Sequence, residues 1–384
     1  MLYRLTTPAK TVIGENALDA CRADITALGG KALVVTGKHV EQTGAMRILL
    51  GLLAQWGVGY EVFSGITGEP TVAMIEDGVA AYKASRCDFL IAIGGGSPLD
   101  SAKAIAAMSV LPGAISDYMG REIEGRFPPM VLIPTTAGTG SEATKFTIIT
   151  DTERDVKMLL KGDALLPDLA VIDPAFTLTA PPSVTMASGM DALTHAIESY
   201  TSRRANPLTD ALALDAIARI FRSLPAALQD GGNRLVREDL AIAAYHGGLC
   251  INNASVTLVH GMSRPIGALF HVAHGISNAM ILRPCLTFAM EGCPGRFAAM
   301  ARAIGAADGS RSAKDGAKAF LKALDDLCGS AGVPSLRQYG IDRGRFLALT
   351  DKMATDAMAS GSPGNTIREV TKEDLIGIYQ SLWG

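Results

Sequence analysis

Three of the six histidines and one arginine lie together in the stretch HGMSRPIGALFHVAHG, residues 260–275. His260 and His274 are surrounded there by strongly apolar sequence, in which an unpaired imidazole is costly to bury. Neutral imidazoles are good ligands for divalent first-row metals. The stretch therefore predicts that both histidines have partners in the folded chain, and a metal ion is one such partner.

A carboxylate and a further histidine occur upstream, in MASGMDALTHAIESY, residues 186–200. Asp191 and His195 are four positions apart on a helical pattern, so their side chains emerge on the same face. Such a pair alone is more often hydrogen-bonded at a surface than a metal site. Together with His260 and His274, however, it gives one carboxylate and three imidazoles. This set suits Fe²⁺ or Zn²⁺ and does not suit Ca²⁺ or Mg²⁺, although spacing alone does not show that the two segments meet.

Two glycine-containing loops form a second group of chemically suggestive residues. In FLIAIGGGSPLDSAKAIA, residues 89–106, a buried strand runs into three glycines and then a helix. The pattern predicts Ser97 as the helix N-cap, Pro98 as its first residue and Asp100 as a side chain that reaches back to unpaired amides. Gly95 and Gly96 would let a pyrophosphate approach the helix N-terminus, although a tight turn without a ligand would have the same pattern.

The second loop favours the ligand-binding interpretation of the first. LIPTTAGTGSEAT, residues 132–144, leaves another strand into small residues whose hydroxyls can donate to phosphate or ribose oxygens: Thr135, Thr136, Thr139 and Ser141. Two such loops after strands of one sheet are typical of a dinucleotide site.

The residue pattern of the sequence changes near residue 180, and this change predicts two domains. Short β-rich runs at 32–36, 89–93, 130–134, 146–150 and 170–173 alternate with helical patterns, which favours an open, mostly parallel α/β sheet. After TAPPS, residues 179–183, long Ala/Leu/Met-rich segments with helical periodicity dominate. We therefore expect a dinucleotide-binding α/β domain over residues 1–181 and an all-α metal and substrate domain over residues 182–384.

Composition excludes several classes of partner. Of 384 residues, 48% are hydrophobic and 19% charged, and the formal net charge is −3 without a basic run, which argues against nucleic acid or an anionic membrane. Six scattered cysteines show no CxxC spacing, which indicates reduced thiols and neither a disulfide framework nor a thiolate zinc site. The first residues resemble neither a signal nor a transit segment, so we expect a cytoplasmic protein acting on a small molecule.

Four motifs in register, GGGSPLDSAKAIA, PTTAGTGSE, SGMDALTHAIESY and HGMSRPIGALFHVAHG, resemble those of the iron-containing (group III) alcohol dehydrogenase family. The resemblance implies a Rossmann-like N-terminal domain and a helical C-terminal domain. It also implies a reaction in which a hydride passes between an alcohol carbon and C4 of NAD or NADP while a divalent metal polarises the oxygen. It assigns Fe²⁺, with Zn²⁺ as the alternative, to the four ligands already considered: Asp191, His195, His260 and His274. It assigns the dinucleotide to Gly95, Gly96, Ser97, Thr135, Thr136, Thr139 and Lys157. We also expect Gly37 and Asp100 among the cofactor-site residues. It also implies a homodimer or higher homo-oligomer.

Two positions depart from the pattern of many relatives. Gly37 stands where NAD-preferring members often carry an aspartate that repels a 2′-phosphate, and Lys38 and His39 follow it, so we hypothesise that NADP(H) is accepted. A glycine that merely shapes a turn is the alternative. Arg264 stands where many relatives carry a histidine. Its planar, permanently charged fork suits a substrate with an anionic tail, such as a semialdehyde or hydroxy acid, although an internal ion pair is equally compatible.

His271 is a candidate pocket residue or proton relay, with a structural hydrogen bond as the alternative. Glycerol-dehydrogenase-like and maleylacetate-reductase-like oxidoreductases remain open as neighbouring activities. A lyase of the dehydroquinate-synthase type has a related architecture and is a more distant alternative. A decayed, non-enzymatic site finds little support because all four ligand positions are filled.

Overall fold

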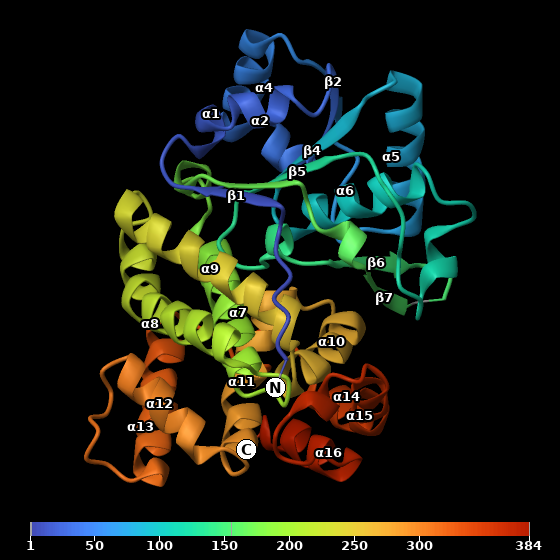
Figure 1. The fold of residues 1–384 in the computed structure, drawn as a ribbon. Coiled ribbons are helices and arrows are strands. Elements are labelled where there is room, and N and C mark those ends of the chain that lie inside the picture. The colour runs from blue at the N-terminus through green and yellow to red at the C-terminus, as the bar shows by residue number, and fades with distance from the viewer. Residues whose placement is uncertain (1, 155, 384) are drawn as a thin grey trace. The chain divides into compact units, whose positions relative to one another are not determined.

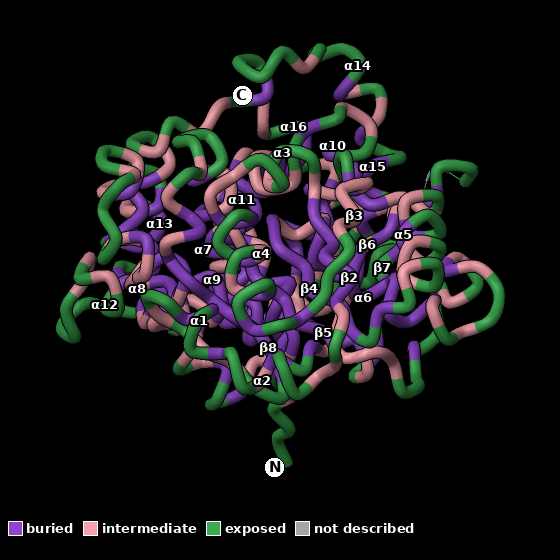
Figure 2. Tube along the Cα trace, turned by 90° about the horizontal axis from the view of Figure 1, so that it is seen from above, coloured by how far each residue is buried: buried purple, intermediate pink, exposed green. Residues whose placement is uncertain are grey.

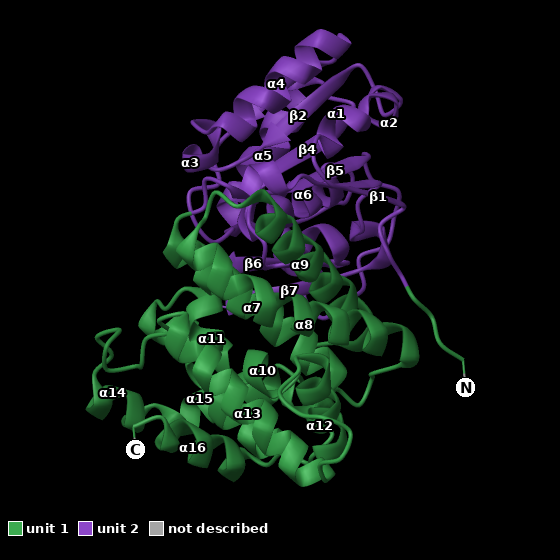
Figure 3. Cartoon of the chain, turned by 90° about the vertical axis from the view of Figure 1, so that its left-hand side faces the viewer, with its two compact units in different colours: residues 1–5, 181–384 green, residues 6–180 purple. Residues whose placement is uncertain are grey.

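The computed structural model describes residues 2–154 and 156–383, which form two compact units (Figure 3). Residues 6–180 make up one unit, and residues 181–384 together with 1–5 make up the other. The N-terminal segment 1–5, expected in the first domain, thus groups with the helical unit. The first strand begins only at Lys10, so this segment takes no part in the sheet.

The unit of residues 6–180 is built on a six-stranded parallel sheet in the order β1-β8-β5-β4-β2-β3. Its strands are β1 (Lys10–Ile13), β2 (Lys31–Val35), β3 (Gly59–Phe63), β4 (Phe89–Gly94), β5 (Met130–Pro134) and β8 (Leu169–Ile172). The central strands are almost entirely buried, as expected for a parallel sheet covered on both faces (Figure 2). The predicted Rossmann-like architecture is confirmed.

Helices cover both faces of this sheet. They are α1 (Ala17–Ala20), α2 (Arg22–Thr26), α3 (Lys38–Glu41), α4 (Gly44–Trp56), α5 (Val72–Ser85) and α6 (Gly96–Met108). Alternate residues of β2 point to opposite sides: Val34 packs in the core with α4, and Leu33 packs in the core with α5 and α6. The connection from β2 therefore runs on one face and that from β4 on the other. Strand order reverses between β2 and β4, which is where open α/β sheets bind their ligands.

One predicted strand lies outside the parallel sheet. Residues 146–150 belong to β6 (Phe146–Asp151), which pairs antiparallel with β7 (Val156–Lys161) as a separate two-stranded sheet. The alternation of buried and half-buried residues in β6 is that of a hairpin with one partly exposed face. This is a correction to the expectation that the run joins the main sheet.

The helical unit contains no β-strand among its described residues. Its helices are α7 (Pro182–Tyr200), α8 (Pro207–Gln229), α9 (Arg234–Ala254), α10 (Leu258–Phe270), α11 (His274–Met290), α12 (Pro294–Ala303), α13 (Ala313–Ser330), α14 (Arg343–Ala348), α15 (Thr350–Ala359) and α16 (Lys372–Ser381) (Figure 1). Pro182 occupies the first turn of α7, where its missing N–H costs no hydrogen bond. Within the described residues, no helix is both long and apolar enough to cross a membrane, and all six cysteines are free thiols.

Candidate functional site

Helix α7 supplies the first half of the candidate metal centre. Asp191 and His195 lie one turn apart on its buried face, with only 3% and 4% of their surfaces exposed. The Asp191 Oδ1 atom lies 3.7 Å from His195 Nε2. The same-face position predicted from the spacing of four is therefore confirmed for this helix.

Helices α10 and α11 bring the second half to the same place. His260 Nε2 and His274 Nε2 each lie 3.6 Å from Asp191 Oδ1. The His195 and His260 rings stack with their centroids 4.7 Å apart, and the His274 ring lies 5.2 Å from that of His260. The segments 186–200 and 260–275, whose proximity spacing alone did not show, thus meet in the fold. Three imidazole nitrogens converge there on one carboxylate oxygen.

These separations fit a four-coordinate divalent ion. Zinc–nitrogen and zinc–oxygen bonds of about 2.1 Å in a tetrahedron place neighbouring ligand atoms about 3.4 Å apart. The separations of 3.6–3.7 Å measured from Asp191 Oδ1 are close to this value. The ligand atoms of Asp191, His195 and His260 all lie within 4.8 Å of one another, a group that does not include His274. His274 joins it through the 3.6 Å separation of its Nε2 from Asp191 Oδ1. The donor set is of the kind that Fe²⁺ and Zn²⁺ accept.

The electrostatics favour an ionised carboxylate among imidazoles. Burial tends to raise the pKa of Asp191, but the neighbouring His195, His274 and His260 outweigh it and hold that pKa well below the usual range. His274 is only partly buried, with 38% of its side chain exposed, but loss of solvent around the ring lowers its pKa to about 3, against the smaller attraction of Asp191. An anionic oxygen and a neutral imidazole are the protonation states that bind a metal ion.

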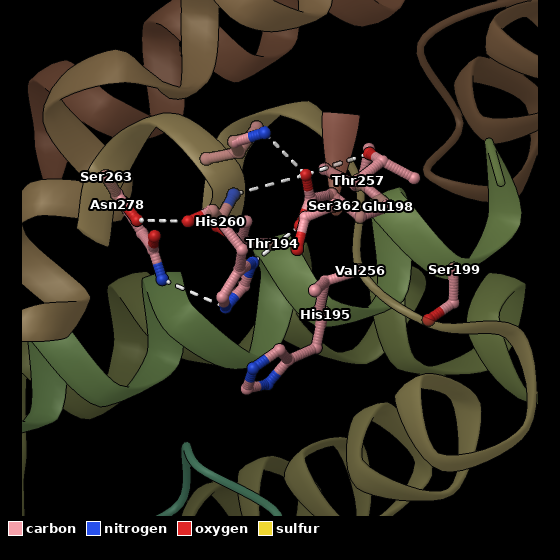
Figure 4. A network of polar contacts seen from close by, with 12 residues as sticks. Thr194, His195, Glu198, Ser199, Val256, Thr257, His260, Ser263, Asn278 and Ser362 are labelled. Atoms are coloured by element: carbon pink, nitrogen blue, oxygen red, sulfur yellow. Dashed lines mark hydrogen bonds and ion pairs between the residues drawn. The ribbon is translucent and has the colours of Figure 1, made fainter. Parts of the chain in front are cut away.

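Two residues that the sequence analysis did not single out complete the centre (Figure 4). Glu198 lies three positions after His195, and its Oε2 accepts from His260 Nδ1. Asn278 lies four positions after His274, and its Nδ2 donates to Asp191 Oδ1 at 2.7 Å and contacts His260 Nε2 at 3.2 Å. Both are completely buried. The sequence could have indicated both residues by their helical spacing, which is three positions for Glu198 and four for Asn278 after a candidate ligand.

Gly275 allows α11 to begin against α7. A Cβ atom at this position would lie 2.2 Å from the carbonyl oxygen of Ala187, so any side chain would force the two helices apart. The contact therefore gives Gly275 a role in helix packing.

The two glycine-containing loops lie against each other within their unit. The amide of Thr135 donates to the carbonyl of Gly94 at 2.8 Å. A Cβ atom on Gly96 would lie 2.9 Å from Thr139 Cγ2, and one on Gly95 would lie 3.6 Å from Thr136 Oγ1. The loops after β4 and β5 therefore form one continuous group of backbone amides and hydroxyls beside the point where strand order reverses.

The predicted capping of α6 is wrong. The helix begins at Gly96 with Gly95 as its N-cap and without a side-chain cap, so Ser97 and Pro98 lie inside the first turn. The run of glycines lets the chain enter the helix two residues earlier than the Ser-Pro pair suggests. The first amides of α6 therefore have no side-chain cap, and the glycines there carry no side chain that would cover them. This suits an anionic ligand.

Asp100 does not reach back to these amides. Its Oδ2 accepts from the backbone N–H of Ile148 at 2.9 Å, and its carbonyl accepts from Thr147 Oγ1 at 2.8 Å, which ties α6 to β6. Its side chain is only 14% exposed, and burial raises its pKa. The structure therefore gives Asp100 a role in joining two elements, and the predicted reach back to the amides of α6 is wrong. Its expected place among the cofactor contacts stays a prediction.

Gly37 and Lys157 occupy different surroundings. Gly37 precedes α3 directly after β2, and a Cβ atom there would lie 2.8 Å from the carbonyl oxygen of Ile66. Because any side chain would come too close to this oxygen, the backbone itself requires a glycine at position 37. Lys157, on β7, forms an ion pair with Glu69 at 2.6 Å. Their expected cofactor contacts stay predictions.

Arg264 lies in the middle of α10, and His271 is the C-cap that follows its last residue. Arg264, on α10, donates from Nη1 to Ser362 Oγ at 3.0 Å, and no described carboxylate lies within ion-pairing distance of its guanidinium. Burial lowers its pKa, and the charge of Glu198 opposes that effect. His271 is exposed, ends α10 with φ of 54°, and forms no hydrogen bond with another described residue. The structure thus brings neither of them into the ligand set.

Two family models together match most of the chain. Residues 8–174 match the profile described as iron-containing alcohol dehydrogenase, and residues 185–383 match that of the C-terminal domain of the Fe-containing alcohol dehydrogenase family. A 1,3-propanediol dehydrogenase of Klebsiella pneumoniae is 33% identical over 388 aligned positions, which cover 99% of each chain.

Solved structures show the same similarity. The crystal structure of a 1,3-propanediol oxidoreductase superposes with a TM-score of 0.96 at 33% identity and covers 100% of both chains. That of a sulfoacetaldehyde reductase from Bifidobacterium kashiwanohense, in complex with NAD⁺, superposes with a TM-score of 0.87 at 26% identity, covering 100% of this chain and 99% of that one. The relatives are thus oxidoreductases of alcohols and aldehydes.

Proposed function

Because the chain belongs to the iron-containing alcohol dehydrogenase family, we propose that it interconverts a small alcohol and its aldehyde or ketone with one divalent ion and NAD(H) or NADP(H). The observation that carries this proposal is the convergence of three imidazole Nε2 atoms on one oxygen of Asp191 at 3.6–3.7 Å. Such a donor set serves Lewis-acid chemistry.

Four residues would hold the ion: Asp191, His195, His260 and His274. The ion, Fe²⁺ or Zn²⁺, supplies polarisation of the substrate oxygen without changing its own oxidation state. Asp191 contributes the only negative charge of this set. Asn278 holds that carboxylate through its amide and keeps one oxygen turned toward the imidazoles.

The unit of residues 6–180 would bind the dinucleotide. The amides of Gly95, Gly96 and Ser97 at the start of α6 are suited to the pyrophosphate, and the hydroxyls of Thr135, Thr136 and Thr139 are suited to phosphate or ribose oxygens. Direct contact between the two loops supports one shared site for the cofactor.

The proposed activity is tested by removing metal with a chelator, restoring Fe²⁺ or Zn²⁺, and following oxidation of NADH and NADPH with a panel of aldehydes. We expect turnover only with metal restored. Absence of turnover with every aldehyde and both cofactors contradicts the proposal. Turnover of a phosphorylated cyclic precursor alone would favour the dehydroquinate-synthase-like activity.

We further propose that NADP(H) is accepted, since Gly37 presents no carboxylate after β2 and the exposed Lys38 and His39 follow it. Lys38→Ala is expected to raise KM for NADPH about tenfold, the size of one lost charge-assisted hydrogen bond, and to leave KM for NADH unchanged. Lys83→Ala, on the exposed side of α5, is the matched control for loss of a surface charge. Equal effects on both cofactors, or a strong preference of the wild type for NAD(H), would refute this proposal.

Arg264 is proposed to favour substrates with an anionic tail. Of its guanidinium donors, one is used by Ser362, and the competing internal ion pair is not found among the described residues. Sulfoacetaldehyde, the substrate in the name of one structural relative, carries such an anion. Arg264→Met keeps the length of the side chain and removes its charge.

For Arg264→Met we expect kcat/KM to fall about 10- to 100-fold with succinic semialdehyde, because a charge-assisted hydrogen bond contributes about 1.5–3 kcal/mol. With butanal, a neutral aldehyde of the same length, kcat/KM should stay close to that of the wild type. A parallel loss with both aldehydes would show that Arg264 acts on the fold and not on the substrate.

Two expectations from the family resemblance stay predictions. One is the role of His271 in relaying the alcohol proton or lining the pocket, for which its exposed position leaves the ring accessible. The other is assembly as a homodimer or higher homo-oligomer.

A further inference from the structure

Glu198 is a completely buried acidic residue that the proposed reaction does not use directly. It lies on α7, three positions after His195, and its exposed fraction is 0%. An ionised carboxylate in such a place is costly unless each of its oxygens is paired. Its contacts therefore show what keeps it there.

Among the described residues, every hydrogen bond to the Glu198 carboxylate comes from the segment that opens α10 (Figure 4). Oε1 accepts from Thr257 Oγ1 at 2.8 Å, from Val259 N at 2.6 Å and from His260 N at 3.3 Å. Oε2 accepts from His260 Nδ1 at 2.5 Å. One carboxylate thus receives four donors from three residues of the stretch 257–260.

The Oε1 contacts cap helix α10 from outside. The first amides of a helix have no acceptor within it, and Thr257 at the N-cap provides no side-chain acceptor. Glu198 accepts from the amides of the second and third helical residues instead, and its charge lies at the positive end of the helix dipole. The start of α10 is therefore fixed relative to α7.

The Oε2 contact fixes the proton of a candidate metal ligand. An ionised carboxylate can only accept, so the short contact requires the proton of neutral His260 to be on Nδ1. Nε2 then carries a lone pair, and this atom faces Asp191 Oδ1 at 3.6 Å and accepts from Asn278 Nδ2 at 3.2 Å. Hydrogen bonds of this kind set which imidazole nitrogen binds a metal and how the ring is oriented.

We propose that Glu198 is a positioning residue for the metal centre. It caps the start of α10, and it keeps the ring proton of His260 on Nδ1, which leaves Nε2 free to bind a divalent ion. The proposal rests on the metal site of the proposed function. One buried side chain thus fixes both the position of the start of α10 and the ring nitrogen of His260 that carries the proton.

Glu198→Gln separates these two roles. The glutamine oxygen can still accept from the start of α10, but its NH2 group then faces His260 Nδ1 and favours the other tautomer. We expect the affinity of the metal-free full chain for Zn²⁺, measured by competition with a chelator, to fall about 10- to 100-fold. Thr257→Val is the matched control, because it removes one donor to Oε1 and leaves the Nδ1 contact intact; its Zn²⁺ affinity should equal that of the wild type.

Nitrogen-15 NMR of histidine-labelled protein gives a readout that a purely structural role would not move. We expect the His260 ring to carry its proton on Nδ1 in the wild type and in Thr257→Val, and on Nε2 in Glu198→Gln. If Glu198→Gln does not fold, Glu198→Asp replaces it: the shorter carboxylate keeps the tautomer but lowers Zn²⁺ affinity by about tenfold.

Unchanged Zn²⁺ affinity in the folded variant, or a proton on Nε2 of His260 in the wild type, would overturn the role of Glu198. Failure of the wild type itself to bind Zn²⁺ would instead overturn the metal site of the proposed function, so the two failures are distinguishable.

Discussion

Replacing His274 by alanine is expected to lower kcat/KM about 1,000-fold or more, because Lewis-acid stabilisation contributes several kcal/mol and each 1.36 kcal/mol changes a rate tenfold. His274 is the most informative ligand to remove, since 38% of its side chain is exposed and the surrounding core should tolerate the loss. Bound metal should decrease in parallel. The measurement pairs kcat/KM with metal content after dialysis.

His246→Ala is the matched control for this loss. His246 also lies in the helical unit, on α9, but pairs with Asp215 at 2.9 Å and takes no part in the candidate centre. Its replacement should change neither metal content nor kcat/KM appreciably. If His274→Ala keeps the metal content and activity of the wild type, His274 is not a ligand.

The second large effect is expected at the start of α6. Gly96→Val places a branched side chain where a Cβ atom alone would lie 2.9 Å from Thr139 Cγ2, so it should separate the two loops and cover the helix N-terminus. We expect the dissociation constant for NADPH to rise about 100-fold, which corresponds to about 2.8 kcal/mol. Fluorescence titration of the reduced cofactor measures this directly, and metal content should not change.

Gly51→Val in α4 provides the control, because a Cβ atom at Gly51 meets no atom within 4 Å. Both variants put valine in a helix in place of glycine, but only Gly96 lies beside the second loop. A dissociation constant for Gly96→Val equal to that of Gly51→Val would remove the first loop from the proposed cofactor site.

The candidate ligands could be chosen from the sequence because their chemistry is restrictive. A carboxylate and three imidazoles in apolar surroundings leave few roles other than metal binding, and the family motifs select the same four residues. Glu198 and Asn278 are harder to find, since a carboxylate or amide at helical spacing is as compatible with a solvated face as with a buried one. Only the packing of α7, α10 and α11 distinguishes these cases.

The errors of the sequence analysis also have physical causes. Ser97 and Pro98 suit the start of a helix by local preference, but the preceding glycines let α6 begin at Gly96. The run at 146–150 has the composition of a sheet strand, and its partner β7 became visible only in the structure. Strand β3 has three exposed residues at an edge of the sheet, so it lacks the apolar run that identifies the central strands.

The metal centre is tested most directly by anomalous diffraction from crystals of the full chain loaded with Zn²⁺. We predict one ion about 2.0–2.2 Å from a carboxylate oxygen of Asp191 and from Nε2 of His195, His260 and His274. An ion found only elsewhere, or no bound ion at saturating Zn²⁺, would contradict the assignment of these residues as the metal centre.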